Sequence, residues 1–223
     1  MKKLVLILVS VVAVLALVGF AADRAVASVA QSTIDDRLAA SFPGVASTST
    51  RIDGLPVLTQ VARGSLDHVV VSMTGVPTSA GLTLDTVDVD LYSVSTSAPR
   101  TARRVDARAQ VSTAALQAKI GDRYVVRPEG DQLVASLSGG VPVEARLRPV
   151  VTDGTITAEL VSVTLFGLSV DASRLPASLT ERITALVGSL GELPLGLVAT
   201  SATVNAGGVE IVAHGTDVAL EGA

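Results

Sequence analysis

Two histidines, His68 and His214, are the side chains best suited to acid–base chemistry near neutral pH, and each stands among residues that alternate as in a strand. A Ser-His-Asp triad needs a histidine in a cleft beside an activated serine, yet the chain has no Gly-x-Ser-x-Gly turn. The sequence therefore predicts two partly exposed strand histidines and no catalytic residue.

Metal and cofactor chemistry has equally little support. The chain contains no cysteine and no His-Glu-x-x-His motif, so the usual zinc sites are excluded. Asp85, Asp88 and Asp90 in LDTVDVD could supply oxygen ligands to calcium, but the loop and glycine of a calcium site are missing, which favours a solvated sheet face. Phosphate-binding glycine motifs are also absent, and we predict neither a metal nor a cofactor.

One basic cluster, PRTARRVDAR, remains. It has two interpretations, the wet side of a strand or a contact with anionic lipid head groups, for which Arg100, Arg103 and Arg104 are the candidates. Nucleic acid is not an expected partner, because only 2% of residues are aromatic and the formal charge is -4. Removing the first 22 residues, with Lys2 and Lys3, leaves 15 basic and 21 acidic side chains, a charge of -6.

The N-terminus predicts export. Lys2 and Lys3 precede nineteen uncharged residues, Leu4 to Ala22, close to the roughly 20 that span a bilayer as a helix. Residues 1–24 are therefore either an uncleaved anchor or a signal peptide cut after Ala27. Both interpretations place the rest of the chain in the cell envelope, on the outer side of the cytoplasmic membrane.

The remaining residues, 25–223, predict one α+β domain built on a long, mostly antiparallel sheet, because no linker-like composition divides them. The apolar phase shifts near Asp85, which predicts a bulge or bend. Eight or nine strands are expected, at Leu66–Met73, Leu82–Ser95, Arg100–Val111, Tyr124–Arg127, Gln132–Leu137, Val143–Val150, Thr155–Leu165, Leu197–Val204 and Val209–Leu220. Helices are expected at Ala25–Phe42, Val57–Ala62, Leu179–Leu190 and after a Ser112 cap as far as Ile120.

One short motif carries a family resemblance. Gly54-Leu55-Pro56-Val57-Leu58-Thr59-Gln60, followed by Gly64, resembles the Gly-Phe-Pro-Phe-Leu-Thr-Gln signature of the LmeA-like phospholipid-binding family, with both aromatic residues replaced by aliphatic ones. The resemblance extends to Val111, Ser112 and Leu116, to Leu193–Leu197 and to Gly208-Val209.

This resemblance implies a curved sheet wrapped around a helix, similar to the tubular lipid-binding proteins, with an apolar channel for acyl chains. It implies phospholipid and membrane as partners, support of envelope glycolipid (lipomannan-type) synthesis or lipid transfer, and an envelope glycosyltransferase as a candidate partner. No catalytic residue comes with it, and we expect no enzyme.

An acyl-chain channel needs aliphatic walls, since an unpaired buried polar group costs on the order of 1 to 3 kcal/mol. The candidate walls are Val69, Val71 and Met73, then Val87, Val89 and Leu91, then Val163, Leu165 and Leu168, with Leu58 and Val61 closing one end. A solid core would have the same pattern. The sequence thus leaves two hypotheses open, a lipid-binding protein and an envelope scaffold, while a hydrolase requires an essential His68 or His214.

Overall fold

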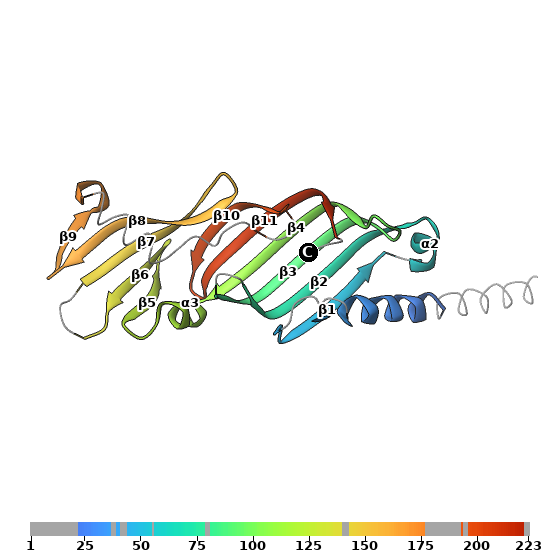
Figure 1. Ribbon diagram of the computed structural model, residues 1–223, viewed down its shortest axis with the longest axis horizontal. Helices are drawn as coiled ribbons and strands as arrows, with labels where there is room; N and C mark the ends of the chain where they lie inside the picture. Colours follow the sequence, from blue (N-terminus) through green and yellow to red (C-terminus); the bar gives the residue numbers. More distant parts are fainter. Residues whose placement is uncertain are drawn as a thin grey trace, which may run out of the picture.

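The described residues form an elongated, mostly antiparallel β structure. The computed structural model describes residues 22–36, 39–40, 44–54, 56–78, 81–139, 143–176, 193 and 196–220, and its two sheets lie end to end (Figure 1).

Six strands form the first sheet, in the order β1-β2-β3-β4-β11-β10, and five form the second, in the order β5-β6-β7-β8-β9. The strands are β1 Ser47–Asp53, β2 Ser65–Pro77, β3 Thr83–Ser95, β4 Thr101–Ser112, β5 Tyr124–Glu129, β6 Gln132–Leu137, β7 Val143–Thr152, β8 Thr155–Leu165, β9 Leu168–Asp171, β10 Val198–Asn205 and β11 Gly208–Ala219. The short helices are α2 Val57–Ala62, α3 Thr113–Ile120 and the 3₁₀ turn η1 Ala172–Arg174.

The antiparallel α+β prediction is confirmed, but the single long sheet is wrong. Two strands were not predicted, β1 and β9, because STSTRID has few apolar residues and β9 is only four residues long. The predicted helix Leu179–Leu190 lies outside the described residues.

Local signals place the short helices correctly. Helix α3 begins where the hydroxyl of Ser112 accepts a hydrogen bond from the Ala115 backbone N–H (3.1 Å), and it ends at Gly121. Helix α2 has the predicted bounds. In η1, the hydroxyl and backbone N–H of Ser173 both donate to Asp171, and they hold the pKa of that carboxyl below its usual range.

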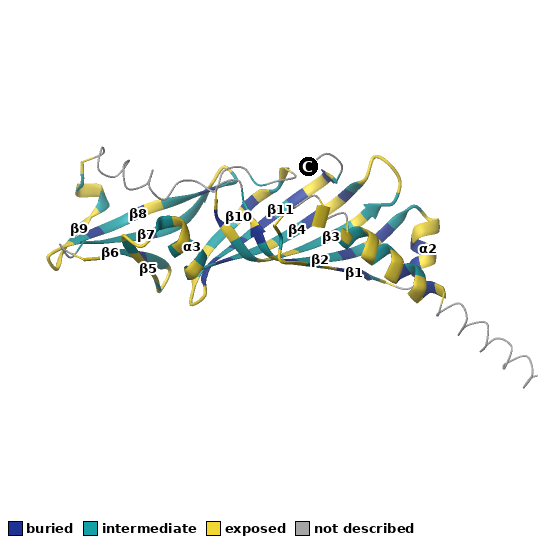
Figure 2. Cartoon of the chain, turned by 60° about the horizontal axis from the view of Figure 1, so that its bottom comes forward, coloured by how far each residue is buried: buried dark blue, intermediate teal, exposed yellow. Residues whose placement is uncertain are grey.

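The first helix, residues 22–36, lies against one face of the six-stranded sheet (Figure 2). Its Ala27, Ala30 and Ile34 belong to the same hydrophobic cluster as Val69 and Val71 of β2. Among the described residues, no helix is long and apolar enough to cross a membrane. Most of the predicted anchor, residues 1–21, lies outside the described part.

The predicted shift of phase near Asp85 is a bend and not a bulge. Register between β2 and β3 continues unbroken through Thr74↔Thr86 and Val76↔Leu84. Gly75, opposite Asp85, has a left-handed φ of 63°. Beyond it the buried side chains stand at even instead of odd positions, so both strands keep an apolar face toward the core.

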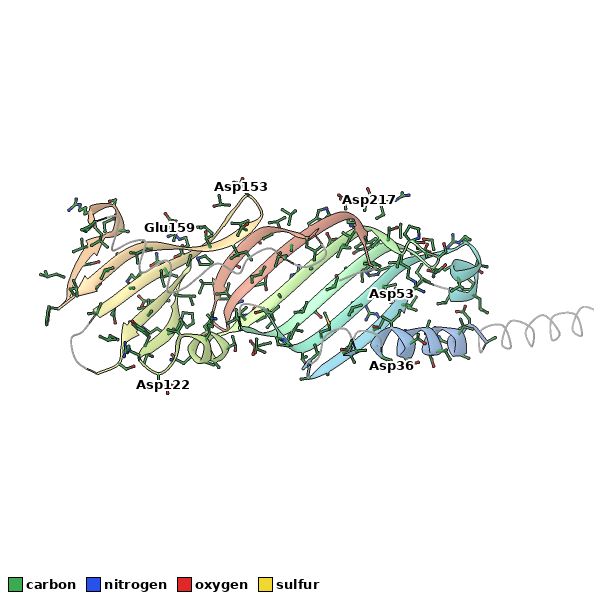
Figure 3. The ribbon with its side chains drawn as sticks, viewed as in Figure 1. Asp36, Asp53, Asp122, Asp153, Glu159 and Asp217 are labelled. Atoms are coloured by element: carbon green, nitrogen blue, oxygen red, sulfur yellow. The ribbon has the colours of Figure 1, made fainter. Side chains whose placement is uncertain are left out.

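A second bend crosses the other end of the sheet. Ser93 in β3 and Asp217 in β11 have left-handed φ values of 53° and 49°, and Asp217 is labelled near that end of β11 in Figure 3. Past these residues the buried side chains again move from odd-numbered to even-numbered positions, at Leu66, Ala102 and Val218. The bend therefore keeps the apolar side chains at the ends of β2, β4 and β11 in one hydrophobic cluster.

The two sheets meet at the turn between β7 and β8, formed by the predicted Asp153-Gly154 pair. The Gly154 carbonyl accepts a hydrogen bond from the Ala199 N–H of β10 (3.3 Å). Ile156, at the start of β8, lies in one hydrophobic cluster with Val209 and Ile211 of β11. One hydrophobic cluster therefore spans both sheets.

Candidate functional site

One side of the six-stranded sheet is apolar from strand to strand, and we call it the apolar face. Its residues follow from the register and the alternation of the strands: Ile52, Val69, Leu91 and Val105; Val71, Val89, Ala107, Ala213 and Ala199; Met73, Val87, Ala109, Ile211 and Ala202. The face bears two polar side chains in these rows, Thr48 and Thr50 of β1. The buried hydroxyl of Thr50 has no hydrogen-bond partner among the described residues.

The apolar face continues into the five-stranded sheet. Leu133 of β6 packs with the cluster at the sheet junction and pairs with Leu147 of β7. Leu147 in turn packs with Leu160 and Val163 of β8. Register between β7 and β8 shifts at Val161, and this bulge keeps Leu160 and Val163 on one side. We call the whole run, from the apolar face through Leu147 to Val163, the apolar stripe.

Part of the middle of the stripe is only half-buried. Val87, Val89, Ala107, Ala109 and Ala202 all point to the apolar face but are only half-buried. Small side chains predominate there, so the strands present methyl groups and little volume. An ordinary core would bury these positions at close packing. The arrangement offers a long aliphatic surface whose centre is only half-buried.

The opposite, polar face of the sheet is tied together by ion pairs. His68 lies between two carboxylates, with Nδ1 3.2 Å from Asp53 Oδ2 and Nε2 2.7 Å from Asp90 Oδ1 (Asp53 is labelled in Figure 3). Its ring stacks on Tyr92 at 4.6 Å between centroids. His214 Nδ1 is 2.8 Å from Asp106 Oδ1. The side chains of His68 and His214 are 26% and 42% exposed, which confirms the prediction of partly exposed strand histidines.

Each aspartate of LDTVDVD has a different partner within the sheet. Asp85 accepts a hydrogen bond from the Ser112 backbone N–H (2.6 Å), and Asp88 accepts one from the Ser72 hydroxyl (2.6 Å). Asp90 pairs with His68. In the part of the chain that the structure describes, no group of three or more acidic or histidine side chains is arranged to hold a metal ion.

The candidate head-group arginines are divided between different surroundings. Arg104 lies on the polar face, with its guanidinium 3.9 Å from the Tyr92 ring centroid and Nε 3.1 Å from Asp106 Oδ2. The sheet therefore separates Arg104 from the apolar face. Arg103 is exposed at the second bend. Arg100 is exposed just before β4, and its carbonyl accepts a hydrogen bond from the N–H of Leu220, which packs against the core cluster.

The predicted wall residues also separate into groups. Seven lie on the apolar stripe: Val69, Val71, Met73, Val87, Val89, Leu91 and Val163. Leu165 and Leu168 lie at the exposed end of the β8–β9 hairpin, 40% and 74% exposed. Leu58 and Val61 are each 41% exposed on α2 and belong to none of the hydrophobic clusters.

The predicted wall residues left out the alanines of the stripe, which are Ala107, Ala109, Ala199, Ala202 and Ala213. Alanine is common on every kind of surface and carries little pattern of its own. The available signal was the alternation of alanine with arginine and glutamine in TARRVDARAQ, which marks one face of β4 as apolar and the other as wet.

The motif from Gly54 to Gln60 is a structural corner. Gln60 is 2% exposed, and its Nε2 donates to the carbonyls of Gly54 (2.8 Å) and Asp53 (3.3 Å) while Oε1 accepts from the Asp67 N–H (2.7 Å). Gly54 has a left-handed φ of 88°, and a Cβ there would lie 2.7 Å from Gln60 Nε2. Asp23 of the first helix accepts from the Leu58 N–H (2.7 Å), so the corner also holds that helix.

Comparison with known proteins identifies the family of the chain. Searches of curated proteins and of solved structures find no match. The family model described as LmeA-like phospholipid-binding matches residues 21–214, which include the corner, the first helix and the whole apolar stripe. Because this match spans nearly the full 223 residues, the chain belongs to the LmeA-like phospholipid-binding family.

Proposed function

We propose that the protein binds phospholipid by laying acyl chains along the apolar stripe of the six-stranded sheet. The observation that carries the proposal is the half-buried centre of the stripe, where Val87, Val89, Ala107 and Ala109 face the apolar side without being fully buried. An acyl chain would cover them, and each methylene moved out of water contributes about 0.8 kcal/mol.

The polar head of such a lipid would stay at one end of the stripe. Arg100 and Arg103 are the candidates, because both are exposed near the bend where Leu220 and Ala102 close the apolar cluster. A guanidinium can hold a phosphate through two parallel hydrogen bonds. Arg104 has no part in this proposal, since it is engaged on the polar face.

The proposal extends to place and role. We infer that the protein works in the cell envelope, on the outer side of the cytoplasmic membrane, where it carries or presents lipid for glycolipid (lipomannan-type) synthesis, beside an envelope glycosyltransferase. Its support is the family and the lysine-led apolar segment from Leu4 to Ala22. Recovery of the protein from the cytoplasmic fraction of its own cells would contradict this location.

Native mass spectrometry of the purified full chain tests the binding itself. We expect co-purified phospholipid in the wild type and at least about a tenfold loss of it in Ala107→Phe, because the ring would displace two or more methylenes from the stripe. The free energy of unfolding of Ala107→Phe should change by less than about 1 kcal/mol, since Ala107 is only half-buried.

Arg108→Phe is the matched control. Arg108 is the next residue of β4, is exposed, and points to the polar face. This variant should keep its lipid. If Ala107→Phe instead lost about 1–3 kcal/mol of stability and the wild type carried no lipid, the stripe would be a solid, overpacked core, as the scaffold hypothesis requires.

We further propose that the protein is not an enzyme. The variant His68→Ala with His214→Ala should keep its bound phospholipid and lose only about 1–2 kcal/mol of stability, because half-exposed ion pairs contribute roughly 0–1 kcal/mol each. Lipid content by mass spectrometry and urea unfolding measure the two effects. If lipid in the wild type were recovered hydrolysed, and intact in this variant, the hydrolase hypothesis would return.

A further inference from the structure

The hairpin between β8 and β9 ends in an exposed apolar tip, Leu165-Phe166-Gly167-Leu168. Phe166 is 72% exposed, Leu168 74% and Leu165 40%. Phe166 is one of three phenylalanines in the chain. The tip stands at the end of the molecule opposite the first helix (Figure 1). Three large apolar side chains therefore gather at the two-residue turn Phe166-Gly167 and at the residues on either side of it.

The turn geometry gives no folding reason for phenylalanine. Phe166 and Gly167 both have left-handed φ values, 50° and 80°, as in the type I′ turns that favour Asn-Gly. A bulky side chain is uncommon at such a φ, and here it is held in water as well. Residues in unfavourable backbone regions cluster where they serve a function.

The tip continues the apolar stripe. Val163 pairs with Val170, and Leu165 pairs with Leu168, so these residues share one side of the hairpin. Exposure rises along β8 from 5% at Val163 to 40% at Leu165. The stripe thus runs from the interior of the protein to the tip without a polar break on that side.

The chemistry of the tip suits lipid better than protein. Residues 160–170 contain no charged side chain, so insertion would bury no charge. Glu144, which faces Thr164 across the sheet, is already paired with Arg127 at 2.9 Å. An aromatic ring with aliphatic neighbours on a convex turn fits the interfacial region of a bilayer, where aromatic side chains gather. A docking protein would normally find charged or hydrogen-bonding side chains around the apolar anchors.

We propose that the β8–β9 tip inserts into a lipid surface, and that the apolar stripe opens onto the bilayer there. The choice of lipid as the occupant rests on the proposed function. The position of the tip, far from the first helix, suits a surface other than the one that would hold the N-terminal segment. Contact is expected with zwitterionic and anionic lipids alike and should not weaken with salt, because no charge takes part.

The chain has no tryptophan, so Phe166→Trp and Leu168→Trp give a clean fluorescence reading. The full chain is reconstituted in phosphatidylcholine vesicles, and acceptor vesicles of phosphatidylcholine or phosphatidylglycerol are added. Brominated lipid is placed in the host vesicles in one arm and in the acceptor vesicles in the other. We expect a blue shift and bromine quenching in one arm, which also identifies the surface. Val125→Trp, 51% exposed on β5 of the same sheet, should show neither.

Phe166→Asn in the Leu168→Trp background distinguishes the effect of Phe166 on lipid contact from its effect on the stability of the fold. Asn-Gly suits the turn, so Tm should be kept or raised, while the lipid concentration for half-maximal quenching rises about tenfold or more, as expected for losing one buried aromatic ring. Quenching in neither arm, or an unchanged midpoint after Phe166→Asn, would overturn the proposal. Bound lipid, measured by native mass spectrometry, is unaffected by Phe166→Asn, so failure of the tip proposal and of the proposed function are distinguishable.

Discussion

Gly208→Ala should lower the free energy of unfolding by at least about 3 kcal/mol. The alanine would have an unfavourable φ, and its Cβ would clash with neighbouring backbone atoms. Gly208 begins β11 with φ 139°, where residues with a side chain are strained, and a Cβ there would overlap the Val111 carbonyl oxygen. It would also lie 2.9 Å from Ser112 C and Thr113 N. That backbone is fixed by the α3 cap and cannot move aside cheaply.

Thermal unfolding of the full chain, with every variant in the same detergent, measures the effect. A loss of about 3 kcal/mol corresponds to a fall in Tm of about 6–12 °C. Gly207→Ala is the matched control. A Cβ at Gly207 would meet only side-chain atoms, Asn205 Oδ1 at 3.3 Å and Gln110 Nε2 at 3.6 Å, and these can shift. Its cost should stay within about 0.5 kcal/mol. Equal losses in the two variants would contradict the proposed cause.

Gln60→Leu should cost about 2–4 kcal/mol, because leucine keeps most of the volume but leaves three backbone groups without their partner. The amide of Gln60 joins Asp53 and Gly54, at the end of β1, to Asp67 in β2. The variant should lose the corner that also fixes the first helix through Asp23. Urea unfolding followed by circular dichroism gives the free energy directly.

Thr59→Ala changes the same motif but leaves the three hydrogen bonds of the Gln60 side chain in place. Thr59 is exposed beside Gln60 in α2, so its replacement should change stability by less than about 0.5 kcal/mol. If Gln60→Leu kept its stability but lost its lipid, the corner would belong to the binding site and not to the scaffold.

The sequence by itself determined the local elements and the class of function. Alternation fixed which side chains share a face, as with Val69, Val71 and Met73 against His68, because adjacent residues of a strand point to opposite sides. Cap and turn residues fixed α3 at Ser112 and the β7–β8 turn at Asp153-Gly154. The absence of catalytic motifs and the signature before Gly64 indicated a lipid-binding family, which the family comparison shows.

Only the tertiary structure decided how these faces combine. The division into two sheets, the bend at Ser93 and the bulge at Val161 set which apolar residues meet, and no short pattern encodes them. The bend opposite Asp85, by contrast, was predicted from the shift of the apolar phase. Asp106 and His214, 108 residues apart, pair across β4 and β11. Arg104 was a head-group candidate until its strand placed it opposite the apolar face. Turns and caps depend on neighbours in the chain, whereas strand pairing depends on partners far away, and a single sequence read locally cannot choose among them.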